Sequence, residues 1–241
     1  MIVYPAIDLL DGACVRLLKG NFDRKTIYHS NPIEQAKEFF ESGTRYLHLV
    51  DLEGARSGKQ QTETIEHIIN HSGLKLQVGG GINNLEIAEK LCDIGADRIV
   101  LGSLAVDKPE ETKKIIKTLG PQRITIAMDC LKDHDNKYYI HTHAWQNKTM
   151  WEYLQFIEFY LEEGIDTFLC TDIVKDGTLT GPSWNLYENI LKAHPQSKVI
   201  ISGGVKSLQD VKKAKKIGAY GLIIGKALYE GHIKLQDALL C

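Results

Sequence analysis

Two aspartates, Asp8 and Asp129, stand at matching places in the chain. Each follows a short apolar run, in "YPAID" at 4–8 and "TIAMD" at 125–129, and the two lie 121 positions apart. A carboxylate at the end of a buried strand is partly desolvated, and this raises its pKa toward the range useful for proton transfer. The pair is therefore a candidate for acid/base catalysis. The alternative is that each carboxylate caps backbone amides of the loop that follows.

Two glycine clusters repeat in the same way. Each follows an apolar run and precedes a helical pattern, in "QVGGGINNL" at 77–85 and in "IISGGVKSL" at 200–208. Here a backbone can approach an anion closely and offer it N–H groups at the start of a helix. One cluster alone is equally well explained as a tight turn with positive φ, but the matched pair favours two anion sites. The spacings GxGxxG and GxxxxGKS/T of nucleotide-binding loops are not met.

The elements that must position these residues alternate along the chain. Helical patterns with apolar residues three or four apart end at glycine, as at 32–43, 84–95 and 208–218. Between such patterns stand short runs rich in β-branched residues, and eight of them predict an α/β fold, a (β/α)8 TIM barrel forming one domain over residues 1–241. The expected strands are 2–8, 46–51, 75–78, 98–101, 123–129, 167–172, 198–201 and 221–225.

The second half of the chain repeats the first. Gly203 lies 123 positions after Gly80, and Asp129 lies 121 positions after Asp8. This predicts two half-barrels of four βα units, about residues 1–121 and 122–241, in which strand n corresponds to strand n+4.

That correspondence has a geometric consequence. Strands four apart lie on opposite walls of an eight-stranded barrel, so the two anion sites should face each other across the C-terminal mouth, where barrel enzymes build their sites. The aspartates should form a second opposed pair about a quarter turn away. A long substrate with a phosphate at each end fits this arrangement. The residues at the relevant strand ends are Gly81, Gly102 and Ser103 on one side, and Gly203, Gly204, Gly225 and Lys226 on the other.

Two stretches are long for loops of a barrel, 9–31 and 172–184, and such lengths are typical of lids or binding loops. Arg16 and Asp176 lie in them and are expected to touch ligand. Trp145 either stacks on an aromatic ring of a substrate or packs within a hairpin.

Other polar residues carry weaker signals. Asp51 and Asp172 also match across the halves and either anchor loops or meet the substrate. His141 and His143 are spaced for a metal, but without an evident third ligand an exposed hairpin is favoured and no metal site is expected. Cys130 and Cys170, which flank the candidate acids in sequence, are expected in the core.

Composition limits the classes of partner. The 241 residues are 43% hydrophobic and carry a net charge of −2, which favours a soluble globular protein with a small-molecule ligand and gives no reason to expect nucleic acid or a membrane surface. The N-terminus lacks the pattern of a signal peptide, and the apolar runs are too short to cross a bilayer. Five scattered cysteines argue against a disulfide framework and fit a reducing cytoplasm. A monomer is expected.

Seven motifs follow one another along essentially the whole chain. They are "YPAIDLLDGACVRLLKGNF", "LVDLEGARSGK", "VGGGINNLE", "VLGSLAV", "CTDIVKDGTLTGP", "SGGVKSLQD" and "GKALYEG". In this order they resemble the phosphoribosylformimino-5-aminoimidazole carboxamide ribotide isomerases of histidine biosynthesis. The resemblance implies a barrel that performs an Amadori rearrangement, from an aminoaldose to an aminoketose, on a bisphosphate ribotide without cofactor or metal.

The same resemblance implies roles for particular residues. Asp8 would be the proton acceptor and Asp129 the proton donor, with Thr171 and Asp176 supporting the reacting sugar. Arg16 and Trp145 would approach the ligand as loops close, and the two glycine-rich sides would each hold one phosphate. The chain departs from the family at Asn83, where Arg is common, and at "GSLAV", where "GTAAV" is usual.

Three other functions remain open from the sequence. The cyclase subunit of imidazole glycerol phosphate synthase shares the repeat, the phosphate sites and the aspartates, although "PAIDL" and "TDI" here differ from its "LDV" and "TSI". A dual isomerase would also act on phosphoribosylanthranilate by the same chemistry. A non-catalytic phosphosugar-binding barrel would keep the sites without turnover.

Overall fold

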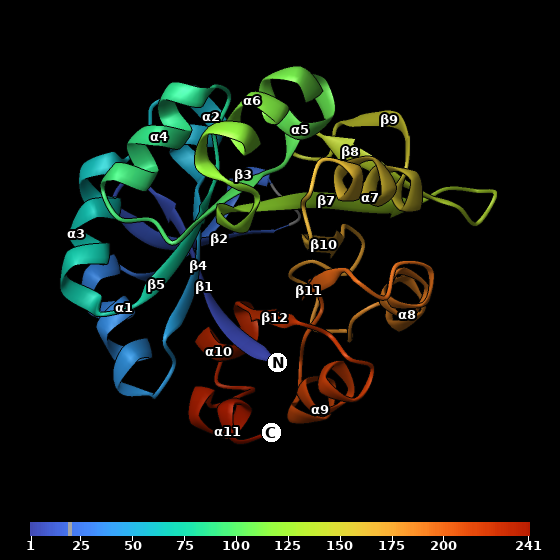
Figure 1. Cartoon of the computed structure of the whole chain (residues 1–241). Helices are drawn as coiled ribbons and strands as arrows, with labels where there is room; N and C mark the ends of the chain where they lie inside the picture. The colour runs from blue at the N-terminus through green and yellow to red at the C-terminus, as the bar shows by residue number, and fades with distance from the viewer. Residues whose placement is uncertain (19–20) are drawn as a thin grey trace.

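The computed structural model describes residues 1–18 and 21–241, and eight parallel strands in it close into a barrel (Figure 1). Each strand pairs with the next, β12 pairs with β1, and β10 pairs with β7. The predicted (β/α)8 barrel is therefore confirmed. Around the barrel the strands are β1 (Ile2–Leu10), β4 (Tyr46–Asp51), β5 (Lys75–Gly79), β6 (Arg98–Leu101), β7 (Ile124–Lys132), β10 (Thr167–Asp172), β11 (Lys198–Ser202) and β12 (Gly221–Ile224).

Helices surround these strands (Figure 1). Local signals place their ends: Asn31 caps the first helix with its side chain and Pro32 occupies the first turn, while Ser207 and Asp210 form a capping box on another. The helices are α1 (Pro32–Glu41), α2 (Leu52–Ser57), α3 (Thr62–Ser72), α4 (Leu85–Asp93), α5 (Ser103–Asp107), α6 (Pro109–Leu119), η1 (Pro121–Arg123), α7 (Tyr153–Glu162), α8 (Trp184–Ala193), α9 (Leu208–Lys216), α10 (Lys226–Tyr229) and α11 (Leu235–Leu240).

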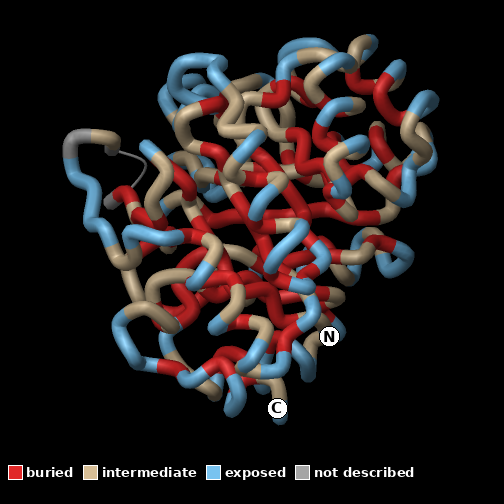
Figure 2. The backbone as a smooth tube through the Cα atoms, turned by 90° about the vertical axis from the view of Figure 1, so that its left-hand side faces the viewer, coloured by how far each residue is buried: buried red, intermediate tan, exposed pale blue. Residues whose placement is uncertain are grey.

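Apolar side chains pack on both sides of the barrel wall. A large cluster fills the layer between strands and helices, and a small one fills the barrel itself. Figure 2 shows the buried residues, in red, concentrated in the interior of the molecule. This burial on both faces explains why the strands read as continuous apolar runs rather than as alternating patterns. The interior cluster consists of Tyr4, Ala6, Val100, Leu169, Ile200 and Ile223.

Two hairpins extend the barrel strands at matching places. β1 continues into β2 (Ala13–Leu18) and β3 (Asn21–His29), and β7 continues into β8 (Tyr138–Thr142) and β9 (Asn147–Glu152). The sequence interpretation ended the first and fifth strands at the two aspartates, and this was wrong. Antiparallel pairing beyond each aspartate carries β1 to Leu10 and β7 to Lys132.

The expected loop at 9–31 is therefore mostly a hairpin, with residues 19 and 20 outside the described residues. The stretch after β10 remains without strand or helix until α8 begins. The division of the domain into half-barrels at about residue 121 stays a prediction.

Candidate active site

The glycine clusters follow β5 and β11 and adopt the same backbone shape. Gly80 and Gly81 have φ of 99° and 68°, and Gly203 and Gly204 have φ of 93° and 85°. A Cβ at Gly81 would overlap the backbone of Gly54, and one at Gly204 would lie 2.6 Å from a carbonyl oxygen. Both clusters are thus required by turn geometry, and they also leave the backbone uncovered by side chains where a ligand can approach.

The ends of β6 and β12 match even more closely. Gly102 has φ −106° and ψ −98°, and Gly225 has φ −106° and ψ −97°. Each precedes a short helix that receives no side-chain cap from the residues that the structure describes. The third N–H of each helix donates to the carbonyl of that glycine, which leaves the first two to donate to an anion. Ser103 begins the helix on one side and Lys226 begins it on the other.

A pocket on the C-terminal side brings the predicted residues of the second anion site together. Arg16 and Asp176 line it together with all four of these residues, Gly203, Gly204, Gly225 and Lys226. The Lys226 ammonium donates a hydrogen bond to the Gly177 carbonyl at 3.1 Å. A cation and several uncovered backbone groups therefore face the same space, as binding of a phosphate requires.

Asp8 is tied to a cation. One guanidinium nitrogen of Arg16 donates to Asp8 at 2.9 Å and another donates to Asp176 at 2.5 Å. Burial raises the pKa of Asp8, and the adjacent Arg16 charge opposes that rise. Arg16 and Asp176 are 160 positions apart in the chain, and hairpin β2–β3 and the loop after β10 bring them together.

Asp129 lies in a different environment. Among the residues that the structure describes, no ion pair joins it to a cation, and burial raises its pKa to about 6. The Thr171 hydroxyl and the Trp145 indole donate toward it and hold the pKa down, whereas the nearby Asp176 charge raises it. Thr171 pairs directly with Asp129 across β10 and β7. Asp129 thus keeps a proton to much higher pH than an exposed aspartate does.

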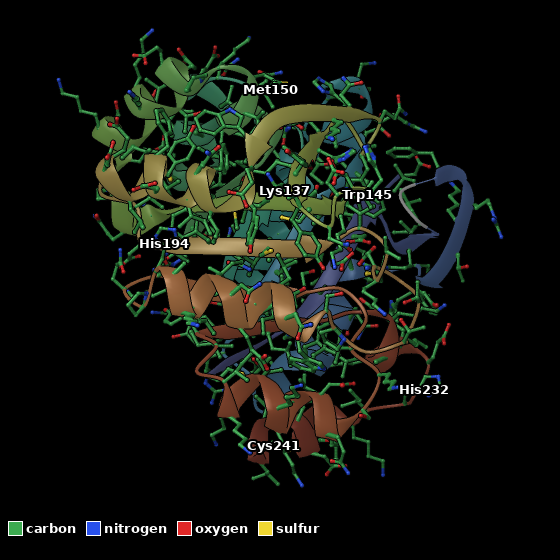
Figure 3. The ribbon with its side chains drawn as sticks, turned by 90° about the vertical axis from the view of Figure 1, so that its right-hand side faces the viewer. Lys137, Trp145, Met150, His194, His232 and Cys241 are labelled. Carbon is green, nitrogen blue, oxygen red and sulfur yellow. The ribbon has the colours of Figure 1, made fainter. Side chains whose placement is uncertain are left out.

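Trp145 reaches this place from the turn between β8 and β9. Figure 3 shows it on the same side of the barrel as hairpin β2–β3, opposite His194, which follows α8. On the first anion side, the backbone N–H of His143 in the same turn donates to the Ser103 hydroxyl at 3.3 Å. Asn83, the departure noted in the sequence, is exposed.

The second pair of matched aspartates anchors loops. Asp51 is fully buried and accepts hydrogen bonds from the backbone of Gly54 at 2.9 Å and of Gln61 at 2.7 Å. Asp172 is also buried and accepts one from the Val174 backbone at 2.9 Å. These contacts favour the anchoring interpretation over a direct role toward substrate.

The histidines at 141 and 143 lie in a hairpin, as the sequence favoured. The group of potential ligands that gathers among the described residues is Asp133, His134 and Asp135, at the exposed tip of the β7–β8 turn, and includes neither. Exposed acidic groups of this kind are common without an ion.

One polar pair was missed by sequence reasoning. His48 and Gln77 point into the barrel and hydrogen-bond at 3.0 Å, and burial together with the Arg16 charge lowers the pKa of His48 to about 3. A neutral imidazole therefore lies beside Ala6, two residues before Asp8 in β1. In the sequence, the one indication of this buried pair was a histidine within the apolar run "YLHLV".

Fold and site together define a class: a (β/α)8 barrel with two matched pairs of glycine-containing strand ends around a pair of acids in unlike environments. The chain belongs to the histidine biosynthesis protein family, whose model matches residues 2–234. Among the described residues, none of the helices has the length and apolarity to cross a membrane.

Curated relatives resemble the chain over its length. A protein of Francisella philomiragia is 43% identical over 242 residues, covering 100% of both chains. One of Elusimicrobium minutum is 41% identical, covering 99% of both, and one of Lactococcus lactis subsp. cremoris is 42% identical, covering 98% of this chain and 94% of its own. All three are named 1-(5-phosphoribosyl)-5-((5-phosphoribosylamino)methylideneamino) imidazole-4-carboxamide isomerase.

Proposed function

We propose that this chain is the isomerase of histidine biosynthesis that its relatives are named for, converting the phosphoribosylamino group of that substrate to its phosphoribulosyl form. The observation that carries the proposal is the pairing of two matched glycine-lined sites around Asp8 and Asp129. A bisphosphate substrate needs two anion sites, and an aldose-to-ketose rearrangement needs two proton carriers.

The phosphates would be held by unlike sets of groups. The backbone at Gly81 and Gly102 and the Ser103 hydroxyl would bind one, and the backbone at the second cluster with the Lys226 ammonium would bind the other. Fixing both ends places the reacting ribose between the aspartates, and such positioning lowers the barrier before any chemistry occurs. The residues of the second site are Gly203, Gly204, Gly225 and Lys226.

Asp129 would start the reaction as the proton donor. Its pKa near 6 keeps a fraction of it protonated at neutral pH. Transfer of that proton to the ring oxygen breaks the bond between this oxygen and C1 of the ribose, and the nitrogen lone pair forms a protonated imine at C1. Thr171 would keep the carboxyl in place through its hydroxyl.

Asp8 would then act as the proton acceptor. The adjacent Arg16 favours its ionised form, so it can remove the proton from C2. The electrons of that C–H bond form a C1–C2 double bond and neutralise the imine, which gives an enolamine. The hydroxyl at C2 then loses its proton as C1 gains one, so the product is a ketone with no net change in composition. Asp176 would position Arg16, and Trp145 would cover the reacting part of the substrate.

The site as proposed is built from a single chain, so we propose that a monomer is sufficient. The cysteines of the described residues are free thiols, which fits an enzyme of the reducing cytoplasm.

Steady-state turnover tests this function. Purified protein is assayed on the formimino ribotide without ammonia or glutaminase, and separately on phosphoribosylanthranilate. We expect turnover of the first, abolished in Asp8→Asn and Asp129→Asn. Turnover of both would instead define a dual isomerase. Tight binding of the bisphosphate with no turnover would overturn the proposal in favour of a cyclase or a binding protein.

A further inference from the structure

The turn that carries Trp145 has an unusual backbone. His143, Ala144 and Trp145 have φ of 55°, 51° and 72°, so three successive side-chain-bearing residues adopt the left-handed conformation. L-residues rarely take this conformation, and a run of three persists only where surrounding contacts hold it. The contacts of this turn therefore decide where Trp145 lies.

His143 supplies several of those contacts. Its ring Nε2 lies 3.6 Å from a carboxylate oxygen of Asp107, and its Nδ1 lies 3.0 Å from the Thr142 hydroxyl and 3.4 Å from the Asn147 amide nitrogen. The amide nitrogen can only donate, so Nδ1 accepts and the ring proton belongs on Nε2, where it points to Asp107. The neighbours thus decide which ring nitrogen faces Asp107, and they place the His143 ring beside α5.

The backbone of His143 is attached to the same helix. Its N–H donates to the hydroxyl of Ser103, the first residue of α5, at 3.3 Å. A hydroxyl has one proton to donate and two lone pairs that accept. Because one lone pair receives the His143 N–H, the Ser103 proton is left to point elsewhere, toward the first phosphate of the proposed substrate.

The opposite end of the turn reaches the reacting centre. The Trp145 indole donates toward Asp129 and lowers its pKa, and the Trp145 carbonyl lies 3.2 Å from Nδ1 of His141. From His143 to Trp145 is two residues, so a displacement of the first displaces the second. Ser103, His143 and Trp145 consequently form one connected path between a phosphate site and a proton donor.

We propose that His143 is a positioning residue that couples the first phosphate site to Asp129, by latching the β8–β9 turn onto Ser103 and Asp107. This proposal rests on the function proposed above. A phosphate that accepts the Ser103 proton strengthens acceptance of the His143 N–H by the same oxygen, because hydrogen bonds in a chain polarise one another. Phosphate binding and placement of the indole at Asp129 then support each other.

Fluorescence tests the coupling without turnover. Inorganic phosphate is titrated into the full chain, and the contribution of Trp145 is obtained as the difference from Trp145→Phe. We expect phosphate to change the Trp145 fluorescence, and we expect Lys226→Gln to retain this change and Ser103→Ala and His143→Ala to lose it. Calorimetry should show that His143→Ala binds phosphate several-fold more weakly than the wild-type chain. An unchanged response in His143→Ala would overturn the proposal.

Kinetics with the bisphosphate substrate give a second test. We expect His143→Ala to lower kcat/KM about 10-fold. The double variant with Ser103→Ala should have a kcat/KM little lower than that of the poorer single variant, because the effects of contacting residues in one path are not additive. Losses that multiply would contradict the coupling. His134→Ala is the matched control, because His134 is also a hairpin histidine beside an aspartate but is highly exposed.

A glycine variant separates latching from simple relief of strain. His143→Gly adopts positive φ readily but lacks the ring. The proposal expects it to be as slow as His143→Ala, whereas wild-type kinetics would show that the backbone alone matters. If the wild-type chain shows no turnover, the proposed function is wrong. The fluorescence result would still show whether His143 couples phosphate binding to the position of Trp145.

Discussion

The two proposed phosphate sites of the barrel share a backbone conformation and differ in the charge of one side chain. Gly102 and Gly225 agree within about a degree in φ and ψ, yet the next residue is Ser103 on one side and Lys226 on the other. The second side also has the Arg16 guanidinium about 3.5 Å from where a Cβ of Gly225 would lie. Backbone N–H groups would thus provide a shared ability to bind phosphate, while the residue that leads the helix offers an uncharged hydroxyl on one side and an ammonium on the other.

The two acids between these sites also have different side chains around them. Burial raises the pKa of both carboxyls, but Arg16 is paired with Asp8 and opposes the rise there, whereas Asp129 receives indole and hydroxyl donors and its pKa rises to about 6. A carboxylate whose ionised form is favoured by an adjacent cation is suited to accept a proton, and one without such a cation that keeps its proton is suited to donate. The asymmetry of side chains on a repeated backbone would therefore separate the two proposed roles.

The largest expected effect comes from removing the acceptor. Asp8→Asn should lower kcat by about 10³-fold, within the range for general acid/base groups, because an amide cannot accept the C2 proton. The measurement is steady-state turnover, with circular dichroism to verify folding. Asp11→Asn is the matched control, since Asp11 is exposed and pairs with Lys25. Comparable losses in both variants would refute the assignment.

The pH profile tests the donor. Activity requires Asp129 protonated, so kcat/KM should fall as pH rises through about 6, approaching tenfold per pH unit. Thr171→Val removes a donor that lowers this pKa, so the falling limb should move to higher pH. The phosphates of the substrate also titrate near pH 6, but a fall in kcat/KM that they cause would occur at the same pH in Thr171→Val as in the wild-type chain. An unmoved limb would therefore assign the titration to the phosphates.

Much of this architecture follows from the sequence. The eight apolar runs predicted the barrel strands, because strands buried on both faces leave a continuous apolar signal. The repeat predicted the matched glycines, because Gly80 and Gly203 meet the same backbone requirement of positive φ. The resemblance supplied roles for the acids that spacing alone could not.

Contacts between distant residues were beyond prediction. The Arg16–Asp176 pair depends on a hairpin and a loop 160 positions apart, and nothing local in either segment specifies the partner. The continuation of β1 past Asp8 was missed, because its pairing with "ACVRLL" leaves little alternation to read. The latch between His143 and Ser103 likewise requires the folded turn.

Substitution of the two helix-leading residues sharpens the comparison of phosphate sides. Lys226→Gln should raise KM about 30-fold, because an ammonium that pairs with phosphate is lost. Ser103→Ala should lower kcat/KM about 5-fold, because the donor that is lost carries no charge of its own. Binding of substrate should weaken with salt less steeply in Lys226→Gln than in Ser103→Ala. Equal salt slopes would contradict the proposed difference in charge.

The smallest expected effect is on stability, and it distinguishes the acids. The pKa of Asp129 is raised in the folded state, from 3.8 to about 6, so above pH 6 the ionised carboxylate opposes folding and below pH 4 it does not. Asp129→Asn should therefore raise the free energy of unfolding at pH 8 by on the order of 2 kcal/mol, with the gain shrinking as pH falls from 6 to 4.

Urea denaturation at pH 8 and at pH 4.5 measures this gain. Asp8→Asn should gain less at pH 8, because it leaves the partly buried Arg16 with Asp176 as its remaining carboxylate partner among the described residues. An equal gain in both variants would mean that Arg16 does not offset the burial of Asp8. The electrostatic difference between the acids would then be too small to assign one as acceptor and the other as donor.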